Sequence, residues 1–299
     1  MDNRKYEALI WIAKTGSITQ TAEQMGYTQS GITQMISSLE RELGLRLLTR
    51  TNKGASLTEA GRRLLPLMQE ENHWENHIRQ EASRMLGMET GTITVGCLSS
   101  ISAAWMPTIL ENFAFDYPNI HIHMRENEAP ELERLLMEGQ IDVAIAEIRD
   151  SKSLKVKPLL EDEILAVLPL KHPLSERDSV SLEELTKYPF ISYSTGGNGE
   201  QYWGWPEHTL GSRIQLDARY SCTSDFAAIQ MVSHNLGVTV ASRLMLDNYP
   251  LVTKNIPLSP ALHRSIGIGV RAGQPALPAA RSFINYVVQI VDMITRNGS

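Results

Sequence analysis

Short polar side chains share one face of a segment near the N-terminus, and their chemistry suits recognition of nucleic-acid base edges. At helical spacing, this face carries Gln29, Ser30, Thr33, Gln34 and Ser37. Amides and hydroxyls both donate and accept hydrogen bonds, so they can bond to base edges and phosphates. The opposite face is an apolar stripe of Ile32, Met35, Ile36 and Leu39 that would pack on neighbouring helices. The alternative interpretation is a solvated helix face in an ordinary three-helix bundle.

The flanking residues predict a helix-turn-helix. Ser17 and Gln20 have the spacing of a capping box, which predicts a short helix over 18–25. Thr28 caps a second helix that runs to Leu43. Two helices joined by so tight a turn form a unit whose second helix can enter the major groove.

A small β-wing is predicted directly after these helices. The segments 45–50 and 55–58 flank a turn-forming tip at 51–54. Arg50 and Lys53 of this wing could lie along phosphates or enter the minor groove.

Composition limits the class of protein. A chain of 299 residues that is 42% hydrophobic and 21% charged is expected to form two or more globular domains. The net charge of −6 does not indicate nucleic-acid binding, but residues 1–63 hold nine basic and six acidic side chains and therefore carry +3. Without a signal peptide or an apolar run that could span a membrane, we expect a cytoplasmic protein with no membrane partner.

With these features in register, the chain resembles the LysR-type transcriptional regulators. The residues that carry the resemblance are Gly16 to Thr19, Ala22, Thr28 to Ser30, Thr33, Ile36, Leu39-Glu40, Leu43-Gly44, Leu48 to Arg50 and Leu57 to Gly61. Thr21, Gly31 and Leu48 depart from the residues usual in the family. Pattern and resemblance together predict these DNA-contacting residues: Ser17, Thr19, Thr28, Gln29, Ser30, Thr33, Gln34, Ser37, Arg50, Thr51 and Lys53.

A long amphipathic helix is predicted from Thr58 to about Met88. Its apolar residues need a partner to cover them, and a second copy of the chain is the simplest one. The resemblance implies the same, because linker helices of the family pair the DNA-binding domains into dimers, often assembled into tetramers. His73 and His77 have the spacing of a helical metal pair. With no carboxylate motif or third ligand nearby, exposed or dimer-facing histidines are favoured.

After Gly91 the pattern predicts strands alternating with helices, and hence a largely parallel sheet covered by helices. Strands are expected over 92–97, 120–125 and 141–146, with helices over 102–115 and 131–137. A second unit begins with a strand over 164–168 and includes strands over 190–193, 214–219 and 238–241 and a helix over 224–234. A strand over 266–270 and a helix over 276–293 return to the first unit.

This layout is similar to the LysR effector domain, whose fold is that of type II periplasmic solute-binding proteins. The predicted fold class is therefore α/β, with an N-terminal all-α winged helix-turn-helix and an effector domain of two α/β subdomains. The expected boundaries are 1–58 for the DNA-binding domain, 59–90 for the linker and dimerisation helix, and 91–299 for the effector domain. Subdomain I covers about 91–161 and 267–299, and subdomain II about 162–266.

An effector site is expected where strands end at their carboxyl termini, because helix N-termini there supply free N–H groups. The residues at these positions, which match the family's effector contacts, are Ser99, Ser100, Glu147, Thr195, Gly196, Thr223 and Ser224. Each hydroxyl could instead be a plain helix cap. The residues favour only a small organic effector, aromatic if Trp203 and Trp205 flank it.

Other classes of function fit less well. Cys97 and Cys222 could sense oxidants, but relatives that sense peroxide carry cysteines around 195–205, where this chain has none, so buried inert thiols are favoured. A solute-binding protein would need an export signal. No catalytic motif appears, and His121 and His123 have no evident third ligand, so neither an enzyme nor a cofactor is expected. The expected partners are double-stranded DNA, the effector, further copies of the chain and RNA polymerase.

Overall fold

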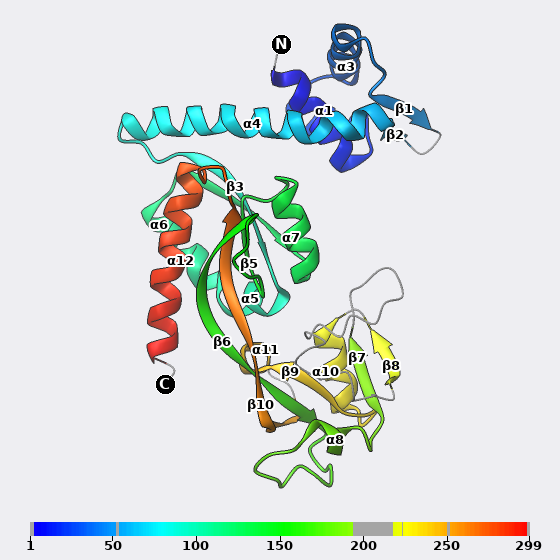
Figure 1. The fold of residues 1–299 in the computed structure, drawn as a ribbon, viewed down its shortest axis with the longest axis vertical. Helices are drawn as coiled ribbons and strands as arrows, with labels where there is room; N and C mark the ends of the chain where they lie inside the picture. The colour runs from blue at the N-terminus through cyan, green and yellow to red at the C-terminus, as the bar shows by residue number, and fades with distance from the viewer. Residues whose placement is uncertain (1–2, 52–53, 194–217, 223, 250–251, 298–299) are drawn as a thin grey trace.

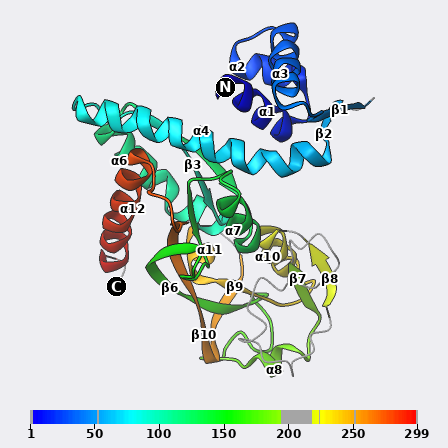
Figure 2. The same ribbon diagram turned by 45° about the horizontal axis from the view of Figure 1, so that its top comes forward.

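The computed structural model describes residues 3–51, 54–193, 218–222, 224–249 and 252–297. Three parts follow one another along the chain (Figures 1 and 2). A small helical domain at the N-terminus is joined by one long helix, α4 (Glu59–Met85), to a larger domain of strands and helices. The long helix lies between the two domains in both views.

The N-terminal domain is three helices followed by a two-stranded wing. Its elements are α1 (Asn3–Thr15), α2 (Ile18–Met25), α3 (Gln29–Leu43), β1 (Leu48–Thr51) and β2 (Gly54–Leu57). Leu9, Ile32 and Leu39 are fully buried between the helices. The wing is tied to the turn before α2 by a bond from the Ala55 N–H to the Gly16 carbonyl, at 2.8 Å.

The helix caps decide where α2 and α3 begin. The Ser17 hydroxyl accepts from the Gln20 N–H at 3.3 Å, and the Thr28 hydroxyl accepts from the Gly31 N–H at 3.1 Å. Of the two bonds that make up the capping box predicted at Ser17, only the bond from the Gln20 N–H is present. At Ser181 both bonds of a capping box are present. Left-handed glycines, Gly26 and Gly44, end the two helices.

Helix α4 (Glu59–Met85) is capped by Thr58, whose hydroxyl accepts from the Gly61 N–H at 3.0 Å. Its first turn packs tightly on the wing. A Cβ placed on Gly61 would lie 2.3 Å from the Leu47 carbonyl oxygen, so only glycine fits this approach.

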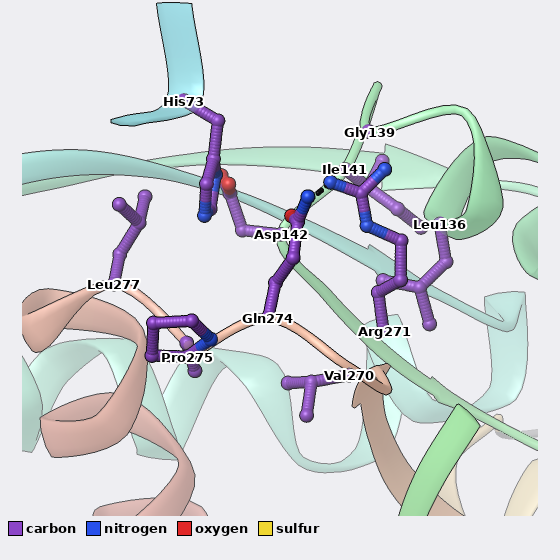
Figure 3. Close-up of a pocket in the computed structure, with 11 residues that line it drawn as sticks. His73, Leu136, Gly139, Ile141, Asp142, Val270, Arg271, Gln274, Pro275 and Leu277 are labelled. Carbon is purple, nitrogen blue, oxygen red and sulfur yellow. Dashed lines mark hydrogen bonds between the residues drawn. The ribbon is translucent and has the colours of Figure 1, made fainter. Parts of the chain in front are cut away.

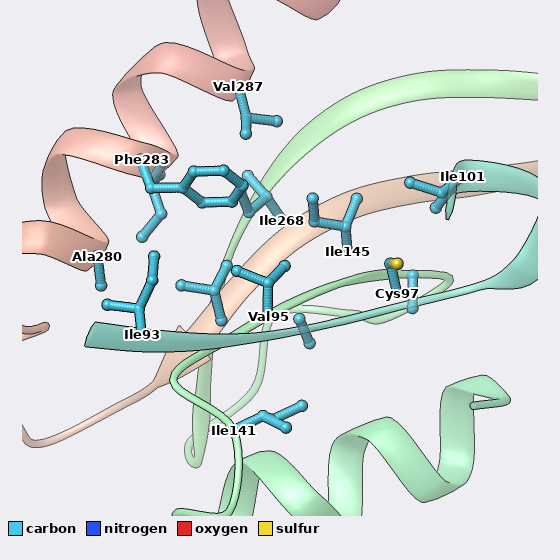
Figure 4. Packing of buried hydrophobic residues seen from close by; sticks show 14 of the residues in the cluster. Ile93, Val95, Cys97, Ile101, Ile141, Ile145, Ile268, Ala280, Phe283 and Val287 are labelled. Carbon is cyan, nitrogen blue, oxygen red and sulfur yellow. The ribbon is translucent and has the colours of Figure 1, made fainter. Parts of the chain in front are cut away.

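The first half of the larger domain has a parallel sheet that is covered by helices. Strand β3 lies between β4 and β5 and pairs with both in parallel. Ile93, Val95 and Phe283 are buried between this sheet and α12 (Figure 4). The elements are β3 (Gly91–Cys97), α5 (Ser99–Ala104), α6 (Met106–Asp116), β4 (Ile120–Glu126), α7 (Ala129–Met137), β5 (Val143–Ala146) and α12 (Pro278–Asn297).

The prediction of one helix in this domain is wrong. The sequence predicted a single helix over 102–115, but the chain forms α5 and α6 with a break at Trp105. Pro107 lies in the first turn of α6 and has no N–H to donate, so a continuous helix would lose a backbone bond there. The helix also begins earlier than expected, so Ser99 and Ser100 lie in the first turn of α5.

Two long antiparallel strands, β6 (Leu154–Leu168) and β10 (Lys254–Arg271), run from the first half into the second (Figure 1). The sequence predicted only five residues of each. Together with β9 (Thr239–Ser242) they complete a six-stranded sheet of order β4-β3-β5-β10-β6-β9. The subdomains are therefore joined by continuous strands.

The second half packs shorter elements around the ends of these strands. Strands β7 and β8 form their own parallel pair, and Ile191, Ile229 and Val232 are fully buried beside them. The strand expected over 214–219 is seen from Ala218 onward, and 214–217 lie outside the described residues. The elements are α8 (Leu182–Leu185), β7 (Phe190–Tyr193), β8 (Ala218–Cys222), α10 (Asp225–Ser233), β9 (Thr239–Ser242) and α11 (Arg243–Asn248).

Within the parts of the chain that the structure describes, none of the helices has the length and apolar character to cross a membrane.

A partly buried carboxylate, Asp142, ties the start of β5 to β3. Its Oδ2 accepts from the Thr94 N–H at 2.7 Å. Burial raises the pKa of Asp142 to about 6, although the Thr94 bond and the positive charge of Lys14 oppose the shift. The folded protein therefore binds this proton more tightly than the unfolded chain does between about pH 4 and pH 6.

We predict that Asp142→Asn becomes more stabilising, or less destabilising, as the pH rises. The wild-type chain loses stability as pH rises through about 6, because the buried carboxyl must ionise, whereas the amide does not ionise and still offers an acceptor to Thr94. The free energy of unfolding of the variant, minus that of the wild type, should increase by up to about 3 kcal/mol between pH 4 and pH 7. Urea unfolding at several pH values measures this, with the exposed Glu133→Gln as control. A pH-independent difference would contradict it.

Candidate functional sites

The first candidate site is the outward face of α3. Gln29, Ser30, Gln34 and Ser37 are exposed along it. Thr33 is half-buried, and its hydroxyl donates to the Gln29 carbonyl at 2.9 Å. Four of the five predicted side chains are therefore exposed to an external partner, and the fifth is oriented by its own helix.

The predicted contacts around α2 and the start of α3 lie near that face. Thr28 and Ser17 act as caps, and Thr19 is exposed in the first turn of α2. The hydroxyls of Thr28 and Ser30 are 3.0 Å apart. The N–H groups at these helix starts carry partial positive charge, which suits contact with phosphates.

The wing adds a second surface beside α3. Strands β1 and β2 are antiparallel, with Arg50 opposite Ala55. The side chains of Arg50 and Thr51, and all of Lys53, lie outside the described residues. Their predicted DNA contacts therefore stay predictions.

A groove of about 180 Å³ between α3 and the wing contains a cation that was not predicted from the sequence. Arg46 lines it together with Thr33 and Ser37. The Arg46 side chain is 85% exposed, and its ion pair with Glu40, at 3.4 Å, is long. The sequence could have indicated this contact only through the position of Arg46, which lies between the end of α3 and the wing.

The second candidate site is the junction of the two subdomains. The Arg264 guanidinium lies at its centre. Its Nε donates to Asp162 Oδ2 at 2.9 Å, and its Nη2 donates to Ser100 Oγ and to Ser242 Oγ, each at 2.8 Å. Nη2 also forms an ion pair with Asp162 Oδ2 at 2.8 Å. Ser100 belongs to α5 and Ser242 caps α11, so one guanidinium joins both subdomains.

Every partner in this cluster is buried. Asp162, Ser100 and Ser242 are each at most 4% exposed, and Asp162 Oδ1 also accepts from the Leu244 N–H at 3.0 Å. A buried ion pair is stable only when hydrogen bonds satisfy its remaining donors and acceptors, and this cluster meets that requirement.

A second bond crosses the junction beside the first. The Ser99 hydroxyl, in the first turn of α5, donates to Asp225 Oδ2 in the first turn of α10 at 3.1 Å. Ser224 is exposed and caps α10 by accepting from the Ala227 N–H at 3.4 Å. Ser99, Ser100 and Ser224, three of the predicted effector residues, thus lie at or beside the contacts that join the two halves.

Carboxylates surround this junction. Glu147 and Glu128 are half-buried. Burial raises the pKa of each, and the positive charge of Arg264 opposes both shifts. Thr195, Gly196 and Thr223, like the Trp203 and Trp205 suggested for an aromatic ligand, lie outside the described residues. The effector-binding assignments are therefore untested.

Arg264 and Asp162 were not predicted from the sequence. They face each other across β10 and β6, whose full lengths were not predicted either. A basic residue in one segment and an acidic residue about a hundred positions earlier give no local signal that they pair.

Neither histidine pair forms a metal site among the residues that the structure describes, where no group of three or more metal-ligating side chains gathers. His73 and His77 are half-buried on α4, while His121 and His123 are exposed on β4. The latter strand lies at an edge of the sheet.

The two thiols occupy different environments. Cys97 is fully buried at the end of β3, and burial raises the pKa of its thiol to about 12. A thiol with so high a pKa is almost wholly protonated at neutral pH and is a poor nucleophile. Cys222 is half-exposed and donates to the Ser224 carbonyl at 3.2 Å.

We predict that iodoacetamide at pH 8 labels Cys222 alone in the folded protein and both cysteines in urea. Intact mass measured over time would show one added group in buffer, with Cys222→Ser as the control that abolishes it. Rapid native labelling of Cys97 would show that its thiol is accessible, and a redox role would then have to be considered again.

Comparison with known proteins gives two family matches. The model described as "Bacterial regulatory helix-turn-helix protein, lysR family" matches residues 4–62, and the model described as "LysR substrate binding domain" matches residues 87–291. Both models describe families of regulators, not enzymes.

Individual relatives are similar over nearly their whole length. The uncharacterized HTH-type transcriptional regulator YvbU of Bacillus subtilis is 26% identical, over 95% of this chain and 97% of its own. The probable HTH-type transcriptional regulator LrrA of Synechococcus elongatus is 25% identical over all of both chains. Among solved structures, a full-length variant of OxyR from Pseudomonas aeruginosa has the same fold, with a TM-score of 0.73, 20% identity and coverage of 97% of this chain and 94% of that one.

Proposed function

The chain belongs to the LysR family of transcriptional regulators, and we propose that α3 reads operator bases while an effector at the Arg264 junction controls how the DNA is held. The observation that carries this proposal is the exposed row of amides and hydroxyls on a helix whose opposite face is buried. The boundaries proposed for the three parts are 1–58, 59–90 and 91–299, with the subdomain limits expected from the sequence.

Different contacts should supply sequence preference and general affinity. Gln29, Ser30, Gln34 and Ser37 are placed for base edges in the major groove. Arg46 and the wing flank α3 and would contact the backbone, together with the caps at Ser17 and Thr28. Phosphate contacts fix the position of the helix, and base contacts select the sequence.

We predict that Gln29→Ala and Arg46→Ala weaken DNA binding in different ways. The first should lose about 1–3 kcal/mol on the DNA that flanks its own gene and little on random duplex, because an amide–base contact is lost. The second should weaken binding to both duplexes alike and reduce the salt slope by about 1. Fluorescence anisotropy across a salt series measures both. Equal losses on both duplexes for Gln29→Ala would contradict base reading by α3.

The effector is proposed to act on the closure of the two subdomains. Arg264–Ser100 and Ser99–Asp225 link the halves in this structure. A ligand that bonds to Ser99 or Ser100 would compete with these contacts and favour a different closure. A ligand shifts such an equilibrium only by its difference in affinity for the two states.

We propose that the chain acts as a homodimer, assembled further into a tetramer, through the outer face of α4. Four large apolar side chains are exposed there at helical spacing: Leu67 is 63% exposed, Trp74 43%, Ile78 68% and Met85 81%. An exposed stripe of this kind needs a partner helix, and an identical stripe is the simplest complement. A symmetric dimer would present two α3 helices to two half-sites.

We predict that Ile78→Glu weakens dimer formation, because it places a charge in the middle of this stripe. Sedimentation velocity should show a dissociation constant at least 10-fold higher than that of the wild type. Asn76→Glu adds the same charge at an exposed position two residues away and serves as the matched control. If both variants sediment like the wild type, the stripe is not the dimer interface.

We further propose that this regulator acts in the cytoplasm, where its DNA is, and that RNA polymerase is a partner of the DNA-bound form. The support is the family's role in transcription.

A further inference from the structure

Helix α4 contacts its own effector domain through polar side chains. Four of its large apolar residues form the exposed stripe described above, and Met68 is buried in the N-terminal core, whereas Glu70, Gln80 and Glu81 hydrogen-bond to residues of the effector domain. Contacts of this kind can be exchanged for water at a smaller cost than buried apolar surface. The joint between linker and effector domain therefore has the chemistry of a contact that can open.

One residue of this joint is buried. Gln80 is 6% exposed, and its Oε1 accepts from the Ala279 N–H at 3.1 Å. Ala279 is the second residue of α12, so its N–H has no acceptor within its own helix. The side chain of a linker residue thus caps the last helix of the effector domain.

The same side chain also meets the start of β3. A Cβ built on Gly91 would lie 2.7 Å from Cδ and Nε2 of Gln80, so the chain passes directly over the amide. Gln80 therefore contacts both the strand through which the chain enters the effector domain and the helix that completes it.

The neighbouring contacts are weaker. Glu81 pairs with Arg281 at 3.1 Å, Glu70 pairs with Arg271 at 3.5 Å, and the Ser282 hydroxyl donates to Glu89 at 3.0 Å. Ion pairs with exposed partners contribute little to stability. Loss of the Gln80 bond, by contrast, leaves a buried N–H without an acceptor.

The joint is less tightly packed earlier along α4, around His73. This side chain lies over Pro275 and, together with Asp142, Arg271 and Gln274, lines a cavity of about 30 Å³ (Figure 3). Burial, followed by the charge of Arg271, lowers the pKa of His73. The cavity has room for about one water molecule.

We propose that Gln80 is the positioning residue that fixes the angle between α4 and the effector domain, and hence the placement of the DNA-binding domain. This inference rests on the proposed DNA-binding function. Release of the Gln80–Ala279 bond frees the start of α12 and lets α4 turn about the segment 86–90, while each domain keeps its own core. The buried amide is therefore the point at which movement in the effector domain reaches the DNA-binding domain.

The test compares Gln80→Leu with Gln80→Glu in the full chain. Leucine keeps much of the volume and removes the acceptor. The carboxylate keeps an acceptor, and the N-terminus of α12 favours its negative charge. Arg79→Ala is the matched control, because Arg79 is exposed and bonds to Glu75 of its own helix. Amide hydrogen exchange and DNase I footprints on the DNA flanking its own gene are the two readouts.

The expected result for Gln80→Leu is exchange at least 10-fold faster at Ala279 and a footprint of altered length, with the wild-type pattern in Gln80→Glu and Arg79→Ala. A footprint of normal length with fast exchange would show that Gln80 is only a helix cap and overturn the proposal. Unchanged exchange would overturn it as well. If Gln80→Leu does not fold, Gln80→Ala takes its place. Absence of any wild-type footprint would instead refute the proposed DNA-binding function.

Discussion

The effector domain depends on one buried ion pair, Arg264–Asp162, at the place where its two longest strands pass between subdomains. Removing either charge would leave the other buried without a partner, which costs far more than an exposed pair contributes. Because Arg264 also holds Ser100 and Ser242, the pair sets how the two halves meet. A ligand at this junction would meet an arrangement that is already satisfied, and it could act only by offering bonds that fit another arrangement better.

The N-terminal domain was predictable because its signals are local. Thr28 precedes α3 and Gly44 follows it, and both act within a few residues of their own position. The full lengths of β6 and β10 were not predicted, because Pro158 and the acidic run Glu161-Asp162-Glu163 interrupt the pattern of the first part of β6. Their place in a strand depends on pairing with residues a hundred or more positions later. The split between α5 and α6, by contrast, had a readable signal in Pro107.

The candidate sites also differ in how far they could be predicted from the sequence. The face of α3 follows from periodicity alone, since a helix with one buried stripe must expose the other side. The effector residues were selected by their position after strands, and that rule places Ser99 and Ser100 at the junction. It does not reveal that each hydroxyl already has a partner, Asp225 for Ser99 and Arg264 for Ser100. Those partners come from distant segments, so only the folded chain brings them together.

The two faces of helix α4 carry different kinds of side chain, and the contacts that each face makes or is proposed to make explain the difference. A contact that must persist, such as one between copies, is best made from apolar surface, because water cannot replace it cheaply. A contact that has to change with the effector is better made from hydrogen bonds and ion pairs, whose net contribution is small and which water can satisfy. The stripe around Ile78 has the first character, and the ion pairs of Glu70 and Glu81 have the second. In the proposed dimer, one helix would therefore combine a lasting interface between copies with an adjustable contact to its own effector domain.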